Sequence, residues 1–161
     1  MDIVVDEWFP EYLRDRERMH TALEVMERIF EKCDSMVIME NSPLMKKIRQ
    51  ILKESNHWSD VRQMEILRFF IHHFLTNSLK LHLRSKGLST VIPEDIKKAV
   101  PDLKDLYLFE TLLPAISSEG EGIILTTDVK LKNNSGPLSK YIVLLDYFLE
   151  NYPFEEGDKN G

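Results

Sequence analysis

The chain has 161 residues, about the length of one ordinary domain, and a globular chain of this size buries roughly 70% of its unfolded surface. Hydrophobic residues make up 43% and charged residues 30%, proportions that exclude a disordered chain and a membrane-embedded one. The net charge of −6 repels nucleic acid and anionic membranes at long range, so chemistry on phosphates would depend on bound cations or local basic patches.

Nothing in the sequence indicates secretion or a membrane span. Residues 1–6 lack a basic region ahead of an apolar stretch, and no run reaches the roughly 18 apolar residues that a span requires. The sequence therefore predicts a cytoplasmic protein with no membrane partner. Cys33 is the single cysteine, so it cannot form an intramolecular disulfide, and we expect it to be a buried, small apolar residue.

The chain opens with a predicted strand and a predicted helix. Residues 3–5 are short, apolar and β-branched, and Asp6 follows them, which is typical of a buried strand. From about residue 12 to 33, apolar residues recur at alternating steps of four and three. This spacing predicts a single amphipathic helix.

A second apolar run at residues 36–39 is closed by Glu40 and is too short for a helix. Ser42 and Pro43 then indicate a helix start, and the apolar spacing extends this helix to about residue 54. Together with the first strand, these segments predict a β-α-β unit. Residues 60–86 are apolar-rich and predict one or two helices that end at Gly87.

In the second half, residues 93–95 and 101–102 resemble helix entries, and the second predicts a helix to about residue 117. Residues 122–126 form a third apolar strand, which runs on to Asp128. Residues 129–139 are rich in turn-forming side chains and predict a loop. Residues 141–145 then predict a fourth strand, and a short last helix follows it.

Strands that alternate with helices predict a parallel sheet covered on both faces, because right-handed crossovers place helices on either side. The predicted fold class is therefore α/β, with three α/β/α layers around a mostly parallel sheet of four to five strands. We expect residues 1–152 to form a single domain. The polar tail, residues 153–161, is predicted to be disordered.

Acidic residues follow the predicted strands where these strands end. Asp6, Glu40 and Asp128 are each the first acid after an apolar run. The carboxyl ends of parallel strands share one edge of a sheet, and open α/β proteins bind ligands there. Asp105 lies near the start of the helix that precedes the strand of Asp128. Single acids of this kind commonly cap helices, but their combined placement predicts a site at Asp6, Asp105 and Asp128.

A bound cation would stabilise a cluster of carboxylates. Two carboxylates about 4 Å apart repel each other by about 4 kcal/mol at an effective dielectric constant near 20. Oxygen ligands with few histidines favour Mg²⁺ or Mn²⁺ over Zn²⁺. Such ions can activate water for attack on a phosphodiester and stabilise the leaving oxygen, so the sequence predicts metal-dependent phosphodiester chemistry.

In this order, the motifs resemble those of the PIN-domain family, small α/β nucleases built on a parallel sheet. Residues 3–6 resemble the family's first strand and its aspartate, and residues 105–108 resemble the start of its aspartate-led helix. Residues 124–128 are similar to its closing strand with a Thr-x-Asp motif, and residues 141–152 to its last strand and helix. The resemblance covers about residues 2–152.

The resemblance implies an endoribonuclease that depends on Mg²⁺ or Mn²⁺, with RNA as its substrate. It also implies a possible role as the toxin of a toxin–antitoxin pair, with an antitoxin-like partner, and homodimerisation. The residues that would act in catalysis are Asp6, Asp105, Asp128 and Glu40, and the first three would bind the metal directly or through water. The residues that would bind the substrate are Thr126, Lys46 and Lys130.

Two departures from the family pattern leave other interpretations open. Bulky residues follow Asp6 where the family has a small polar one, and Lys46 and Lys47 lie where the family's glutamate is expected. The alternative is a non-catalytic PIN-like module that binds RNA or a protein partner. A third interpretation is a receiver-like signalling domain, for which Asp6 and Glu7 form a partial acidic pair but no convincing lysine strand follows.

Overall fold

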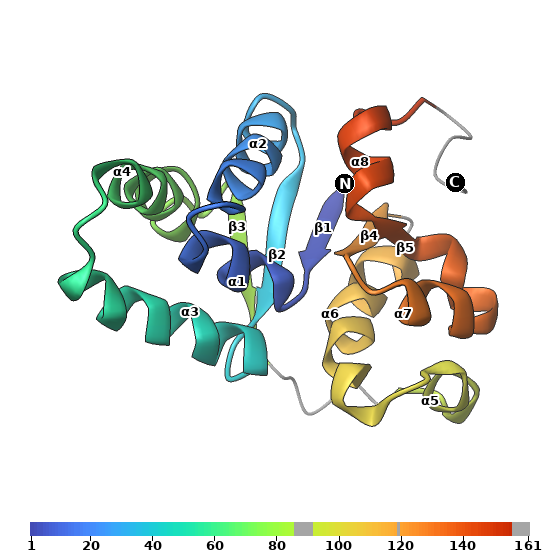
Figure 1. Ribbon diagram of the computed structural model, residues 1–161. Coiled ribbons are helices and arrows are strands. Elements are labelled where there is room, and N and C mark those ends of the chain that lie inside the picture. The colour runs from blue at the N-terminus through green and yellow to red at the C-terminus, as the bar shows by residue number, and fades with distance from the viewer. Residues whose placement is uncertain (86–91, 119, 156–161) are drawn as a thin grey trace.

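A computed structural model gives the fold for residues 1–85, 92–118 and 120–155 (Figure 1). Five strands form one sheet in the order β3-β2-β1-β4-β5, and every neighbouring pair is parallel. This confirms the predicted α/β class, and four of the strands are those predicted from apolar runs. The strands are β1 (Asp2–Val5), β2 (Ser35–Met39), β3 (Leu81–Arg84), β4 (Gly122–Thr126) and β5 (Ile142–Leu144).

Helices cover both faces of the sheet and complete three layers. One face shares its core with α1 (Trp8–Arg14), α2 (Met19–Phe30), α3 (Pro43–Glu54), α4 (Val61–Phe70) and α8 (Leu145–Asn151). The other face packs against α5 (Glu94–Ala99), α6 (Leu106–Ser117) and α7 (Val129–Asn134). In the described part of the chain, no helix has the length and apolar character needed to cross a membrane.

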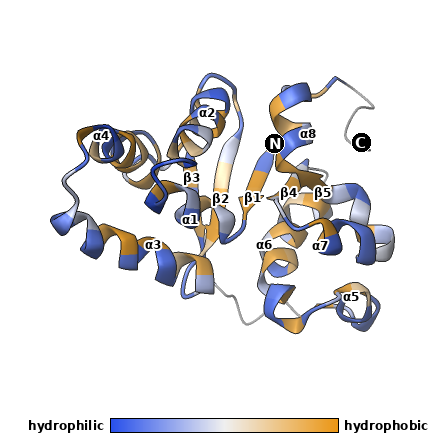
Figure 2. Ribbon diagram, in the orientation of Figure 1, coloured by the Kyte–Doolittle hydropathy of each residue, from blue (hydrophilic) through white to orange (hydrophobic). Residues whose placement is uncertain are grey.

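Successive residues of the strands enter opposite cores. Ile3 and Val5 belong to the core under α1 and α2, whereas Val4 belongs to the core under α6. All of β2 and β4 is buried, because each has a strand on both sides and helices on both faces. Hydrophobic residues accordingly run along the central strands in Figure 2, as expected for a parallel sheet covered on both faces.

The prediction that the first helix is one continuous element is wrong. The chain forms α1 and α2 with a turn at residues 15–18, where Asp15 accepts a hydrogen bond from the backbone N–H of Glu17 (2.8 Å). The prediction that Cys33 is buried is also wrong. Because α2 ends at Phe30, Cys33 lies beyond the helix and is exposed.

The prediction that residues 60–86 are wholly helical is wrong too. After α4 the backbone widens into a π-helix, η2 (Ile71–Leu75), and Thr76 closes it by donating its hydroxyl to the Ile71 carbonyl (2.9 Å). A turn at Asn77 then leads into β3, the edge strand beside β2. The predicted helix end at Gly87 lies outside the described residues.

Residues 129–139, predicted to be a loop, instead form α7 and most of the 3-10 helix η4 (Gly136–Tyr141). Lys132 stabilises this connection, because its Nζ donates to the carbonyls of Ser139 (2.9 Å) and Ile142 (2.7 Å). The start of the predicted disordered tail is ordered, since Phe154 packs against Phe148 with ring centroids 6.0 Å apart. Residues 156–161 lie outside the described chain.

The predicted start of α3 is confirmed and provides a test of the fold. Ser42 is buried, and its hydroxyl accepts a hydrogen bond from the backbone N–H of Met45 (3.1 Å), with Pro43 in the first turn. We expect Ser42→Ala to lower the free energy of unfolding by about 1 kcal/mol, because this N–H loses its partner. Urea denaturation measures the change, and Ser117→Ala, at an exposed helix end, is the control.

Candidate functional site at the carboxyl ends of two strands

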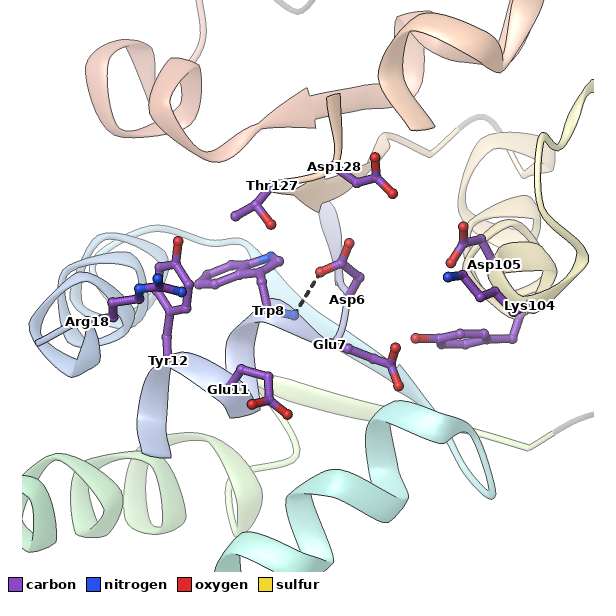
Figure 3. A pocket seen from close by; sticks show the side chains of 11 residues that line it. Asp6, Glu7, Trp8, Glu11, Tyr12, Arg18, Lys104, Asp105, Thr127 and Asp128 are labelled. Atoms are coloured by element: carbon purple, nitrogen blue, oxygen red, sulfur yellow. Dashed lines mark hydrogen bonds between the residues drawn. The ribbon is translucent and has the colours of Figure 1, made fainter. Parts of the chain in front are cut away.

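A cleft of about 350 Å³ opens at the carboxyl ends of the adjacent strands β1 and β4 (Figure 3). The strand order reverses here, because β2 lies on one side of β1 and β4 with β5 on the other, and ligands bind at such positions in open α/β sheets. The lining includes five carboxylates, on Asp6, Glu7, Glu11, Asp105 and Asp128, and two basic side chains, on Arg18 and Lys104.

Asp6 follows β1 directly, and both oxygens of its carboxylate accept hydrogen bonds. Oδ1 accepts from the backbone N–H of Trp8 (3.0 Å), and Oδ2 accepts from the Thr126 hydroxyl. Burial raises the pKa of Asp6 to about 6; the two hydrogen bonds oppose the shift, and the charges of Asp105 and Asp128 add to it. A carboxylate that titrates this close to neutral pH is suited to hold a cation or exchange a proton.

Thr126 connects the two strand ends through its hydroxyl. Its side chain is fully buried, its hydroxyl donates to Asp6, and its oxygen accepts from the backbone N–H of Asp128 (3.0 Å). Asp128 in turn begins α7, where its Oδ1 accepts from the N–H of Leu131 (3.1 Å). Thr126 therefore positions the two aspartates and, being buried, does not line the cleft itself.

Asp105 reaches the cleft from a third segment. It ends the 3-10 helix η3 (Leu103–Asp105), precedes α6 and is half-buried. Burial raises the pKa of Asp105, Lys104 opposes the shift, and other carboxylates including Asp128 and Glu7 reinforce it. Burial, with the charges of Glu7, Asp6 and Asp105, also raises the pKa of Tyr107 in the lining, so its hydroxyl keeps its proton.

Two carboxylates of the cleft were not predicted as site residues. Glu7 and Glu11 lie one helical turn apart at the start of α1, and Lys47 on α3 forms ion pairs with both, at 3.6 Å and 3.3 Å. The spacing of four residues between Glu7 and Glu11 is visible in the sequence. It brings the two carboxylates together only because α1 starts at Trp8, and the apolar pattern did not indicate this helix start.

Trp8 and Tyr12 form one wall of the cleft. Their rings lie edge to face, with centroids 5.1 Å apart. The Trp8 indole is buried and donates to the Leu125 carbonyl (2.8 Å), which ties this wall to β4. The guanidinium of Arg18 lies over the Tyr12 ring at 5.4 Å from its centroid. No sequence motif marked this group, because a turn between two helices brings Arg18 to Tyr12.

The structure brings together only part of the predicted site. Asp6, Asp105 and Asp128 line the same cleft. Glu40, at the end of β2, does not line it, and its Oε2 accepts instead from the Ser85 hydroxyl (3.3 Å). The side chains of Lys46 on α3 and Lys130 on α7 are exposed, and neither belongs to the lining.

The donor set of the cleft suits a hard divalent cation. Carboxylate oxygens are the preferred ligands of Mg²⁺ and Mn²⁺, and Lys47 already neutralises part of the charge of Glu7 and Glu11. Among the described residues, no group of three or more His, Cys, Asp or Glu side chains is arranged to hold an ion. The residues therefore fit an ion held by one or two carboxylates and several waters, a common mode for Mg²⁺.

No family model matches this chain, and comparisons with curated proteins and with solved structures find no match either. A functional assignment therefore depends on the cleft and on the residues that line it.

Proposed function

We propose that this protein is an endoribonuclease that uses Mg²⁺ or Mn²⁺ to hydrolyse phosphodiester bonds in the cleft. The observation that carries the proposal is the convergence of Asp6, Asp105 and Asp128 from three separate segments at the carboxyl ends of β1 and β4. The resemblance of residues 2–152 to PIN-domain nucleases supports RNA as the substrate. It also supports a toxin role with an antitoxin-like partner, or a homodimer, as part of the same proposal.

In this proposal Asp6 and Asp128 hold the ion, and Asp105 acts through a bound water. When bound, the ion supplies an activated water and stabilises the leaving oxygen. Thr126 and the N–H of Trp8 fix the Asp6 carboxylate in place, as supporting groups commonly do for metal ligands. Tyr107 remains protonated and is available to donate a hydrogen bond in the cleft.

One observation favours the alternative of a non-catalytic PIN-like module that binds RNA or a protein. Lys47 lies near the position where the resemblance calls for a glutamate, and its ammonium is paired with Glu7 and Glu11. A positive charge there could take the place of a metal ion. Metal binding therefore separates the two candidate functions.

We expect Mn²⁺ titrated into the metal-free protein to bind with saturation in calorimetry. At ten times its dissociation constant, Mn²⁺ should stabilise the fold by about 1.4 kcal/mol, because it binds the folded cleft only. Asp128→Asn should weaken this binding, because it removes one ligand charge. A labelled RNA oligonucleotide should be cleaved with Mn²⁺ and left intact with EDTA.

Asp146→Asn is the matched control, because Asp146 follows β5 at the same edge of the sheet and does not line the cleft. It should bind Mn²⁺ as the unchanged protein does. Absence of Mn²⁺ binding at millimolar concentration by a folded protein would contradict the nuclease and favour the non-catalytic module.

A further inference from the structure

The acidic centre of the cleft has a basic side chain on each side. In Figure 3, Arg18 lies on one side of Asp6 and Asp128, and Lys104 lies on the other. The two basic groups come from segments far apart in the chain, the turn before α2 and the helix η3. Across the cleft, a basic side chain therefore lies on each side of the acidic centre.

Both basic side chains are available to a ligand. Arg18 is 62% exposed and forms an ion pair with Asp15 at 3.6 Å, and Lys104 is 75% exposed and forms one with Asp102 at 3.5 Å. Exposed pairs of this kind contribute little to stability. A phosphate can therefore replace Asp15 as the partner of Arg18, or Asp102 as the partner of Lys104, at a small cost in free energy.

Arg18 is also part of a fixed aromatic surface. Its guanidinium lies over Tyr12, Tyr12 packs on the edge of Trp8, and the Trp8 indole is anchored to the Leu125 carbonyl. Guanidinium planes and aromatic rings are the surfaces on which single-stranded bases stack. This wall thus combines a guanidinium that can donate hydrogen bonds to a phosphate with a surface on which bases can stack.

The charge of the protein makes such side chains necessary. The chain carries a net charge of −6, and the cleft has five carboxylates, so a polyanion gains no general attraction. In the proposed function, a metal ion at the centre binds the phosphate that is cleaved. Neighbouring phosphates need cations on either side, and Arg18 and Lys104 are the basic groups of the lining.

We infer that Arg18 and Lys104 bind the phosphates on either side of the cleaved one, so that a single strand of RNA lies across the cleft. This inference rests on the proposed function for the identity of the central phosphate. The guanidinium of Arg18 over Tyr12 favours an unpaired strand, because bases held in a duplex are not free to stack on it.

Binding can be measured apart from cleavage. Asp128→Asn serves as a background that does not cleave, and a fluorescein-labelled single-stranded RNA of about ten nucleotides serves as the anisotropy probe, a length within known site sizes. We expect Arg18→Ala and Lys104→Ala each to weaken binding about tenfold. Each should also lower the slope of log K against log salt by about 0.7, because one phosphate contact is lost.

The controls are Arg16→Ala and Lys98→Ala, which remove exposed charges from nearby segments that do not line the cleft. They should leave affinity and salt slope unchanged. An RNA duplex of the same sequence should bind more weakly than the single strand. Arg18→Lys should keep the salt slope and lose part of the affinity, since it retains the charge without the planar stack.

The inference is overturned if the probe does not bind, if the controls weaken binding as much as the two test variants, or if the duplex binds equally well. Failure of the proposed function is distinguishable from these results. Mn²⁺-dependent cleavage, with unchanged RNA binding in the Arg18 and Lys104 variants, would support the proposed nuclease activity and contradict this inference. RNA binding that depends on both residues, with no Mn²⁺-dependent cleavage, would support RNA binding by Arg18 and Lys104 and contradict the proposed nuclease activity.

Discussion

Replacing Asp6 or Asp128 with asparagine is expected to reduce Mn²⁺-dependent RNA cleavage by at least about 100-fold, since even groups that only support metal ligands cost 10- to 100-fold. Asparagine has nearly the same shape as aspartate but lacks its negative charge. The two aspartates follow adjacent strands, and Thr126 bonds to the Asp6 carboxylate and to the backbone N–H of Asp128, so both aspartates should act on the same ion. Single-turnover cleavage of a labelled RNA measures the effect.

Circular dichroism and the unfolding midpoint establish that both variants remain folded. Asp146→Asn is again the control, because it removes a carboxylate beyond the end of β5 without altering the cleft. Its cleavage rate should equal that of the unchanged protein. Undiminished cleavage by purified Asp6→Asn and Asp128→Asn together would refute this site.

The second large effect concerns stability and pH. The pKa of Asp6 rises from its ordinary value of 3.8 to about 6 in the folded protein, mainly because the carboxylate is buried. Between these values the folded state binds more protons than the unfolded state, so the contribution of Asp6 to stability falls as pH rises. Above about pH 6 the full destabilisation is present, and it amounts to about 3 kcal/mol.

We therefore expect Asp6→Asn to be more stable than the unchanged protein by up to about 3 kcal/mol near pH 7.5 in EDTA. The difference should shrink toward zero below about pH 4, where the aspartate is protonated in both states. In this variant the side-chain oxygen can still accept from the N–H of Trp8, but the amide NH₂ faces the Thr126 hydroxyl, which loses its acceptor, so part of this gain is offset. Urea denaturation at the two pH values gives the free energies of unfolding.

Asp146→Asn, which changes an exposed aspartate, should show no such gain at either pH. A lower stability of Asp6→Asn than of the unchanged protein near pH 7.5 would contradict the expected penalty of burial. The combination of lost activity and gained stability is typical of a residue kept for function.

The central strands could be predicted because they are covered on both faces and read as continuous apolar runs. β3 gives no such signal. It is an edge strand with β2 on one side only, and its middle residues, His82 and Leu83, are exposed. An alternating run without β-branched residues, directly after an apolar helix, cannot be told from the last turns of that helix.

The region after Asp128 illustrates a different limit. Turn-forming residues at 133–137 predicted a loop from local preferences alone. The residues on either side of this stretch form hydrogen bonds that favour helices instead. The Asp128 carboxylate caps the start of α7, and the Lys132 ammonium donates to the carbonyls of Ser139 and Ile142. These side-chain contacts, three to ten residues apart, outweigh weak local propensities.

Asp6 and Asp128 were predictable because the end of a parallel strand fixes where the next residues lie, and Asp105 was predictable from its place near the start of the helix before the second of these strands. Arg18, Glu11 and Tyr12 were not, since their place in the cleft depends on the break between α1 and α2. Lys104 reaches the cleft only because η3 precedes α6. These residues carry no spacing motif, so only the folded chain reveals them.

The anchored indole in the cleft wall has a practical consequence. The chain contains two tryptophans, Trp8 and Trp58, and Trp8 is buried in the wall two residues after Asp6. Its emission is an intrinsic optical signal at the candidate metal site. A Trp58→Phe protein would report from this position alone, so events in the cleft can be followed without attaching a dye to the protein.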